Sequence, residues 1–354
     1  MKFEASALGA WAIAVAQAVG WSRVDAEEIV GNLLWADQRG IVSHGLVRLP
    51  VYARRAHAGG IDPRAVPDVD ERTSAVVLVD GRDAAGQVSA AVAAREAAER
   101  AQRFGIGAAW VRNGNHFGPA GFYGERLARQ GLTGFVMCST DAVMSPLGGT
   151  ARTVGTNPIS LFAPPARNGG LAPMVDMATS AVAYGKVIQA QRQGAQIPVG
   201  WGLDRQGRDT TDPDAVLDGG TILPVGGAKG FGLSFMIDVM GGAVAGASTG
   251  PRIGAYLGDP SVPQRLSHVF VAASVAAIDP DGAYATRLEA LVEDVHRNPP
   301  SPAAESHPMI PGEPEWLTSR RDPGWVNLDD RTVADLDELG RLVDGTPMPT
   351  AREA

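Results

Sequence analysis

The sequence predicts an α/β protein in which helices from both ends of the chain flank a central block of strands and helices. The first sixty residues are dominated by apolar side chains at helical spacing. From residue 74 onward, short valine-rich runs alternate with alanine-rich amphipathic segments, which indicates strands connected by helices. Helical periodicity alone returns near residue 284. We therefore expect the two ends to pack together around a mixed-sheet block.

This order of elements divides the chain into two predicted units. Residues 1–66 and 284–354 form a helical unit, and residues 67–283 form an α/β unit. A chain of 354 residues is long enough to bury two such cores.

The N-terminal unit begins with two predicted helices, 5–19 and 24–38, and Ser22 or Asp25 is the expected cap of the second. The C-terminal part contributes helices at 284–297 and 332–344. The stretch 298–328 is rich in Pro, Glu, Ser and Arg and is expected to be an extended surface segment.

The central block contains six predicted strands and four predicted helices. The strands are expected at 74–79, 107–111, 132–138, 158–163, 173–177 and 269–278. The helices are expected at 87–103, 120–130, 183–193 and 230–246. The last of these is apolar along its whole length, so we expect it to be largely buried.

Composition excludes several classes of function. A net charge of -8 provides no electrostatic case for binding nucleic acid. The single cysteine, Cys138, excludes an internal disulfide and a cysteine-based metal cluster, and no metal site is predicted. No apolar run reaches the length of a membrane span, so the cytoplasm is the expected location.

His44 and Arg48 are the first candidate site residues, because they lie four positions apart. On a helix, that spacing would put both side chains on one face. Histidine titrates near neutral pH, and arginine grips a carboxylate through two parallel hydrogen bonds. A third helix is predicted over 46–58, although Pro50 fits a first turn better than an interior. The pair suits a 2-oxo or 2-hydroxy acid; alternatively, it is a surface arginine with an incidental histidine.

Two glycine-rich runs could contact an anion. Gly105-Ile106-Gly107 follows a helix and opens a strand, which is the wrong order for a Rossmann dinucleotide turn. The run 226–232 places Lys229 and bare backbone amides at a helix start, which favours an anion. The alternative is that these glycines only allow tight packing.

His116 is the second candidate histidine. In the run 113–121 a strand ends, His116 stands on a turn, and Pro119 occupies the favoured first position of a helix. Such a histidine is either exposed for chemistry or structural.

Taken in order, several runs resemble the malate/L-lactate dehydrogenase family, which is unrelated in fold to the Rossmann lactate and malate dehydrogenases. They are Ser43-His44-Gly45 with Arg48 and Tyr52, Asn115-His116-Phe117-Gly118, Pro146-Leu147-Gly148-Gly149, Gly155-Thr156-Asn157-Pro158, Asp176-Met177-Ala178-Thr179-Ser180, Gly185-Lys186, Ile197-Pro198, Lys229-Gly230 and Pro311-Gly312-Glu313. Each run alone is weak, but the ordered set is highly specific and spans almost the whole chain. The family includes sulfolactate, ureidoglycolate and diketogulonate-type dehydrogenases and cyclic imino acid reductases.

The resemblance implies an oxidoreductase that uses NAD or NADP and acts on a small 2-oxo or 2-hydroxy acid. It implies a non-Rossmann cofactor domain, an all-helical domain built from both termini, and a homodimer. Arg48 would hold the substrate carboxylate and Thr156 would contact the substrate. The residues implied to line the cofactor are His116, Phe117, Gly118, Pro119, Ala120, Thr140, Asp176, Met177, Ala178, Lys229, Pro311, Gly312 and Glu313.

The resemblance offers two acid-base histidines, His44 and His116. We favour His116 as the proton donor because it stands beside the cofactor loop. His44 would bind the substrate carbonyl or relay a proton through Ser43.

Three positions depart from the family pattern. Gly114 replaces a common serine and is expected to loosen the loop before His116. Lys186 stands where the imino acid reductases carry an aspartate, which argues against that activity. The run 267–269 also differs, and no role is assigned to it. The alternatives are a reductase of piperideine- or pyrroline-2-carboxylate and, more remotely, a nucleotide-binding protein without catalysis.

Overall fold

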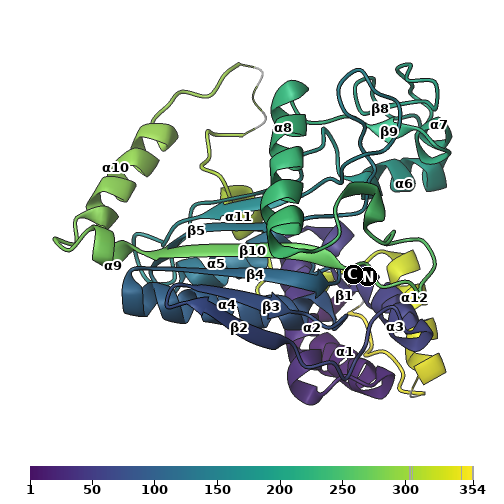
Figure 1. The fold of residues 1–354 in the computed structure, drawn as a ribbon, viewed down its shortest axis with the longest axis horizontal. Helices are drawn as coiled ribbons and strands as arrows, with labels where there is room; N and C mark the ends of the chain where they lie inside the picture. The colour runs from purple at the N-terminus through teal and green to yellow at the C-terminus, as the bar shows by residue number, and fades with distance from the viewer. Residues whose placement is uncertain (303, 305, 344, 353–354) are drawn as a thin grey trace.

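A seven-stranded mixed sheet forms the centre of the computed structural model, which describes residues 1–302, 304, 306–343 and 345–352 (Figure 1). Its order is β2-β3-β4-β10-β5-β6-β7. The strands are β2 (Asp68–Thr73), β3 (Val76–Asp80), β4 (Ile106–Gly114), β10 (Leu266–Ser274), β5 (Leu132–Cys138), β6 (Ile159–Phe162) and β7 (Met174–Met177). Only β3 and β4 are parallel neighbours, and β10 inserts between β4 and β5. This arrangement confirms the predicted mixed α/β fold.

Helices cover both faces of the sheet. On one face lie α4 (Gly86–Phe104) and α5 (Ala120–Ala128), and on the other lie α8 (Ala228–Ile237) and the π-helical turn η3 (Asp238–Ala243) (Figure 1). The buried alanines of α4 let it approach β4 closely; a Cβ on Gly107 would lie 2.2 Å from Ala97 O. On the other face, Ile237 packs against Met137, Ile159 and Val269.

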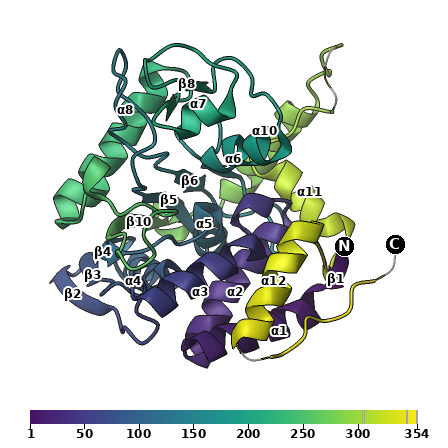
Figure 2. The same ribbon diagram turned by 90° about the vertical axis from the view of Figure 1, so that its right-hand side faces the viewer.

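The two ends of the chain build one helical layer, as predicted (Figure 2). It contains α1 (Ala5–Val19), α2 (Arg23–Gln38), α3 (Leu49–Ala58) and α12 (Asp330–Val343). Leu8, Leu33, Leu49 and Leu336 are fully buried between these helices. The layer also contains a short antiparallel pair, β1 (Lys2–Glu4) with β11 (Trp325–Asn327). The expected cap of α2 is confirmed, because Ser22 Oγ accepts the Asp25 N–H at 3.1 Å.

A buried polar cluster fastens this layer to the sheet. Glu125 of α5 accepts hydrogen bonds from Trp35 Nε1 of α2 at 2.7 Å and from Arg39, the residue that follows α2, at 2.6 Å. These groups are nearly excluded from water, so the relative position of α2 and α5 is strongly specified.

A smaller lobe is inserted in the chain between β7 and β10 of the sheet. It consists of α6 (Tyr184–Gln193), β8 (Gly202–Leu203), α7 (Pro213–Leu217) and β9 (Thr221–Ile222), with η4 (Gly250–Arg252) beyond it. Its own apolar cluster includes Val187, Val216 and Ile222. This lobe brings the start of α6 opposite the helical layer (Figure 2).

Several predicted elements were wrong in detail. The strand expected over 269–278 ends at Ser274, whose side chain caps the short helix α9 (Val275–Ile278). The segment 298–328 is not wholly extended. It contains α11 (Glu313–Arg321), which has Pro314 in its first turn, and β11, which pairs with β1. The helix expected over 230–246 begins at Ala228, changes to π geometry at Asp238, and is not largely buried.

The third predicted helix also differs. Two 3₁₀ turns, η1 (Val42–His44) and η2 (Leu46–Arg48), precede α3. Gly45 between them has an extended backbone, so His44 and Arg48 do not share one α-helical face. The helix begins only at Leu49 because Pro50 occupies its first turn.

The predicted division into residues 1–66 with 284–354 and residues 67–283 stays a prediction. The helix α10 (Tyr284–His296) lies at the far end of the sheet from α3 and α12 (Figure 1). In the described part of the chain, every helix is too short or too polar to cross a bilayer.

Candidate active site

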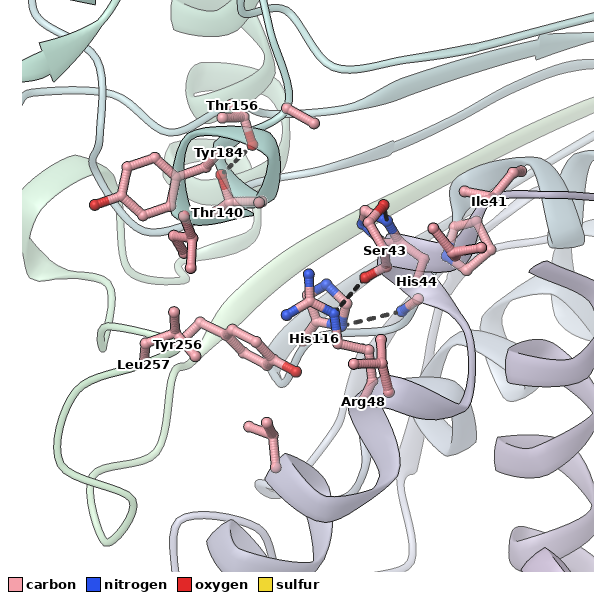
Figure 3. Close-up of a pocket in the computed structure, with 18 of the residues that line it drawn as sticks. Ile41, Ser43, His44, Arg48, His116, Thr140, Thr156, Tyr184, Tyr256 and Leu257 are labelled. Carbon is pink, nitrogen blue, oxygen red and sulfur yellow. Dashed lines mark hydrogen bonds between the residues drawn. The ribbon is translucent and has the colours of Figure 1, made fainter. Parts of the chain in front are cut away.

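A cleft of about 2850 Å³ opens between the helical layer, one end of the sheet and the start of α6. It brings together most of the predicted site residues: Ser43, His44, Arg48, His116, Phe117, Gly118, Pro119, Ala120, Thr140, Thr156, Asp176, Met177, Ala178, Pro311 and Gly312. Figure 3 shows Ser43, His44, Arg48 and His116 on one side and Thr140, Thr156 and Tyr184 on the other. The predicted residues are far apart in sequence, and the fold makes them one site.

Gly45 and Asp37 set the course of the segment that carries His44 and Arg48. The buried Asp37 carboxyl accepts the Leu46 N–H at 2.8 Å. A Cβ on Gly45 would lie 1.7 Å from Asp37 Oδ1, so only glycine fits there. The resulting break turns both functional side chains into the cleft.

Arg48 has the environment of an anion-binding residue. Its Nε donates to Ser43 O at 2.6 Å, and its guanidinium lies 5.1 Å from the centre of the Tyr256 ring. Among the described residues, no carboxylate forms an ion pair with Arg48. A Cβ on Gly185 would lie 3.9 Å from Arg48 Nη2, which places the guanidinium beside the start of α6. The Arg48 guanidinium is therefore held in one orientation by Ser43 and Tyr256, and it has no carboxylate partner among the described residues.

Arg55 holds Tyr256 in place. This buried arginine donates to the carbonyls of Tyr256 and Val262 and so ties the loop after η4 to α3. The Tyr256 ring in turn lies 4.7 Å from the ring of His116, centre to centre.

His116 stands on the turn between β4 and α5, as predicted. Its backbone N–H donates to Gln264 Oε1 at 3.0 Å. Its Nδ1 atom contacts Tyr52 Oη at 2.7 Å and accepts the Gly118 N–H at 3.3 Å. Because a backbone N–H can only donate, Nδ1 carries no proton in this arrangement. The proton of the neutral ring is on Nε2, the nitrogen left for the cleft.

Both cleft histidines are held neutral. Burial, followed by the charge of Arg48, lowers the pKa of His44 to about 3. Burial is also the main cause that lowers the pKa of His116, and His44 and Arg48 add to it. The two rings stack with centres 5.6 Å apart, and Ser43 Oγ hydrogen-bonds His44 Nδ1 at 2.9 Å. A substrate carboxylate at Arg48 would counter one cause of the low proton affinity.

The opposite wall presents hydroxyl groups. Thr140 Oγ1 and Thr156 Oγ1 are 3.4 Å apart, and Asn157 Oδ1 accepts the Thr140 N–H at 2.8 Å. Asn157 is itself held by Ser234 O of α8 at 2.9 Å. This wall can donate to or accept from substrate oxygens.

The residues around the start of α5 fit a dinucleotide. Asp176 of β7 accepts the Gly121 N–H at 2.9 Å, and burial raises the pKa of its carboxyl to about 6. A Cβ on Gly118 would lie 1.8 Å from Asn32 Oδ1, so the backbone here is packed too closely for a side chain. The cleft is large enough for a nicotinamide dinucleotide. The Asp176 carboxylate in its lining can accept hydrogen bonds from the hydroxyl groups of such a molecule.

Two residues implied to line the cofactor lie elsewhere. Lys229 is exposed at the start of α8 and does not line the cleft. Glu313 is also outside the lining; its Oε2 accepts the Ile310 N–H at 2.9 Å and contacts His296 Nε2 at 2.8 Å. Glu313 thus shapes the turn that presents Pro311 and Gly312. In the described residues, no group of three or more His, Cys, Asp or Glu side chains could hold a metal ion.

The departures at Gly114 and at 267–269 are linked. A Cβ on Gly114 would lie 2.9 Å from His268 Cε1. His268 is fully buried, stacks on Phe117 with ring centres 4.5 Å apart, and donates from Nε2 to Asn115 O at 3.1 Å. The histidine occupies the space that a side chain at 114 would need, so the expectation of a loosened loop was wrong.

Sequence reasoning missed Gln87, Gln264 and Tyr256, and it gave Tyr52 no role. All four contact His116 or its partners. No local signal marks them, because Gln87 lies in an alanine-rich helix and the others reach the cleft only in the folded chain.

The sequence matches the model of the malate/L-lactate dehydrogenase family over residues 3–337. The chain belongs to this family. It is 36% identical over 283 residues to a (2R)-3-sulfolactate dehydrogenase (NADP(+)) from Chromohalobacter salexigens, covering 80% of this chain and 83% of the relative. It is 31% identical over 302 residues to a ureidoglycolate dehydrogenase (NAD(+)) from Escherichia coli O157:H7, covering 85% of each.

Solved structures of the family share the fold. The sulfolactate dehydrogenase of Methanocaldococcus jannaschii superposes with a TM-score of 0.87 at 29% identity, covering 97% of both chains. The Δ1-piperideine-2-carboxylate reductase of Pseudomonas syringae pv. tomato gives 0.82 at 30% identity, covering 97% of this chain and 99% of that one. Family membership makes the chain an NAD(P)-dependent 2-hydroxy acid dehydrogenase.

Asp37→Asn should remove a pH-dependent component of stability. Burial raises the pKa of Asp37 to about 7, whereas an unfolded aspartate titrates near 3.9. The folded state therefore binds the extra proton between about pH 4 and 7, and this group's contribution to stability falls as pH rises through that window. Asparagine keeps an acceptor for the Leu46 N–H and does not titrate. The melting temperature of D37N relative to wild type should be higher at pH 8 than at pH 5.

The matched control is Asp294→Asn on the exposed face of α10, which should show the same difference from wild type at both pH values. A D37N protein whose difference from wild type is also independent of pH would contradict the assignment.

Proposed function

We propose that this enzyme transfers hydride between a nicotinamide and C2 of a small anionic 2-oxo or 2-hydroxy acid of the malate, lactate or sulfolactate type. The observation that carries the proposal is the shared cleft in which Arg48 lacks a carboxylate partner and His116 presents Nε2. Arg48 anchors the carboxylate and so fixes C2, an orientation that can lower the activation barrier by several kcal/mol. Thr156 contacts the substrate from the opposite wall.

The nicotinamide, when bound, supplies or takes the hydride. The chain's own residues hold it: His116, Phe117, Gly118, Pro119, Ala120, Thr140, Asp176, Met177, Ala178, Pro311 and Gly312 line the side of the cleft proposed for the dinucleotide. Lys229 and Glu313 do not line this cleft. Assays with NAD and NADP in parallel identify the preferred cofactor.

His116 carries the proton at the substrate oxygen, and His44 with Ser43 supports the carbonyl side of the substrate. His116 is the better donor because Tyr52 and Gly118 orient its ring and Gln264 holds its backbone N–H, whereas the His44 ring has a hydrogen bond with the neighbouring Ser43 hydroxyl.

The imino acid reductase is the second candidate, because a piperideine-2-carboxylate reductase shares the fold. A protonated cyclic imine is a cation at the reacting atom. Here the same cleft is lined by Lys186 and Arg48, which disfavour a cationic group and favour an anion. Turnover of piperideine-2-carboxylate above that of oxaloacetate and pyruvate would reverse this choice.

Arg48→Lys should raise the Michaelis constant for the oxo acid about 10- to 100-fold, because a lysine cannot replace two charge-assisted hydrogen bonds. The turnover number should change only a few-fold. Steady-state kinetics with saturating cofactor measure both. The control is Arg64→Lys, an exposed arginine outside the cleft, which should behave as wild type. An unchanged Michaelis constant in R48K would refute the clamp.

His116→Ala should lower turnover about 10²–10⁴-fold, the usual contribution of a positioned acid or base. His44→Ala should have a smaller effect. In the wild type, binding an anion beside Arg48 should raise the pKa of His116, so the acid limb of turnover should lie at higher pH than that of kcat/KM for oxidation of the hydroxy acid. Near-wild-type turnover in H116A would exclude His116 as the proton carrier.

We also propose a homodimer built on the outer face of α8 and η3. Phe235, Met236 and Val244 there are 49%, 47% and 65% exposed, and Leu233 is partly exposed beside them. A contiguous apolar patch is rarely left to water in a soluble protein. A second copy of the chain covering it would also explain why so apolar a helix is exposed in one copy.

Replacing both Phe235 and Met236 by glutamate should convert the dimer to a monomer, measured by sedimentation equilibrium at micromolar concentration. Val24→Glu, an exposed valine of α2, is the control and should remain dimeric. A monomeric wild-type protein would refute this proposal.

We place the reaction in the cytoplasm. The support is the single cysteine, Cys138, a buried free thiol in a chain without a disulfide partner for it, which is typical of reducing compartments.

A further inference from the structure

Two buried side chains, Tyr52 and Gln87, form a chain of hydrogen bonds that begins at His116 Nδ1. Tyr52 Oη lies 2.7 Å from His116 Nδ1, and Gln87 Nε2 of α4 lies 3.1 Å from Tyr52 Oη. Tyr52 is 1% exposed and Gln87 is fully buried. These side chains are therefore isolated from water, and each hydrogen must find its acceptor inside the protein.

In the structure the hydrogen bonds run toward the histidine. Gln87 donates to Tyr52 Oη, so the tyrosine hydroxyl donates to His116 Nδ1, which also accepts the Gly118 N–H. This arrangement requires His116 to carry its proton on Nε2. In that form Nε2 can donate to a substrate carbonyl and has no lone pair with which to take a proton.

The amide oxygen of Gln87 is buried and has no hydrogen-bond partner among the residues that the structure describes. A half-turn of the amide would place this oxygen, an acceptor, where the nitrogen now meets Tyr52. Tyr52 could then donate to Gln87 and accept a hydrogen bond from a protonated His116 Nδ1. In this second arrangement the Gly118 N–H loses its 3.3 Å contact with Nδ1, because a protonated nitrogen cannot accept it. The same three side chains thus support two opposite hydrogen-bond directions.

We propose that Gln87 is a positioning residue that acts through Tyr52, its amide turning over to support whichever protonation state of His116 the reaction requires. The inference rests on the proposed role of His116 as the proton carrier. It adds a residue of α4 that touches neither substrate nor cofactor.

The proton balance follows from the two arrangements. With Gln87 accepting from Tyr52, His116 Nδ1 is protonated and Nε2 has a free lone pair. As the hydride leaves C2 for the nicotinamide, the hydroxyl proton of the hydroxy acid passes to Nε2, leaving the 2-oxo acid and an imidazolium. The imidazolium then releases a proton to solvent. Reduction runs through the same arrangement in reverse.

The charged and titratable groups that face His116 come from every element packed on it. They are His44, Arg48, Tyr52, Arg55, Tyr256 and His268. Burial with the cationic members of this set lowers the pKa of His116. Gln87 is uncharged. Its amide oxygen can accept the Tyr52 hydroxyl when His116 Nδ1 is protonated, but it adds no charge that would keep His116 permanently protonated.

The test is a double-mutant cycle of Gln87→Met and Tyr52→Phe. Methionine keeps the volume but neither donates nor accepts, so Q87M should leave His116 with its proton on Nε2. Turnover in hydroxy acid oxidation should fall at least about tenfold, with Michaelis constants within about twofold of wild type and the acid limb of the pH profile moved to lower pH. In the Y52F background, Q87M should cause no further loss. A full additional loss there, or a Q87M pH profile that superposes on wild type, would overturn the proposal.

Ser89→Ala is the matched control on the buried face of α4. Ser89 is fully buried and bonds only to Gly86 O, so S89A should reproduce the wild-type pH profile. Melting temperatures of all variants report folding.

A measurement independent of turnover uses ¹⁵N-histidine NMR. In the wild type at neutral pH, His116 Nδ1 should be unprotonated and Nε2 protonated, and the ring should titrate at lower pH in Q87M. A proton on Nδ1 in the free wild type, or identical titration in both proteins, would refute the inference. If instead H116A turns over normally while this titration shifts, the role of His116 in the reaction fails and the Gln87 coupling stands.

Discussion

The hydrogen bond between Tyr52 and His116 joins the helical layer to the sheet inside the candidate active site. Tyr52 belongs to the helical layer that the chain termini build, and His116 follows a central strand of the sheet. The bond is short and buried, so separating the layer from the sheet would leave the Tyr52 hydroxyl without its acceptor.

The electrostatics of the cleft follow from the same burial. Arg48 and Arg55 are close to two imidazoles in a region with little water, and the histidines respond by staying neutral. A site with neutral histidines and with Arg48 lacking a carboxylate partner among the described residues favours an anion, because the anion offsets the positive charge and raises the proton affinity of the histidines. In the proposed function, Arg48 thus couples substrate binding to the acid-base chemistry of the histidines.

Much of the fold and site could be predicted from the sequence. Helical periodicity located α1, α2 and α12, the valine-rich runs located most strands, and ordered motifs located Arg48 and His116. The errors lie where local pattern and tertiary context disagree. The apolar run that forms α8 predicts a buried helix, but Phe235 and Met236 of this helix are exposed in the structure. The spacing of His44 and Arg48 predicts that both side chains lie on one face of a helix. In the structure, Gly45 packs on Asp37 and interrupts the helical segment between them.

By itself the sequence determined the family, the class of fold, and the residue types that meet a carboxylate and a proton, because motifs and periodicity are local properties of the chain. Only the tertiary structure decided which nitrogen of His116 carries the proton, that Glu313 and Lys229 stand outside the cleft, and that Gln87 and Tyr52 lie behind the histidine. These facts depend on contacts between residues tens of positions apart. Hydrogen-bond direction in a buried string is set by every partner at once, and no local pattern encodes it.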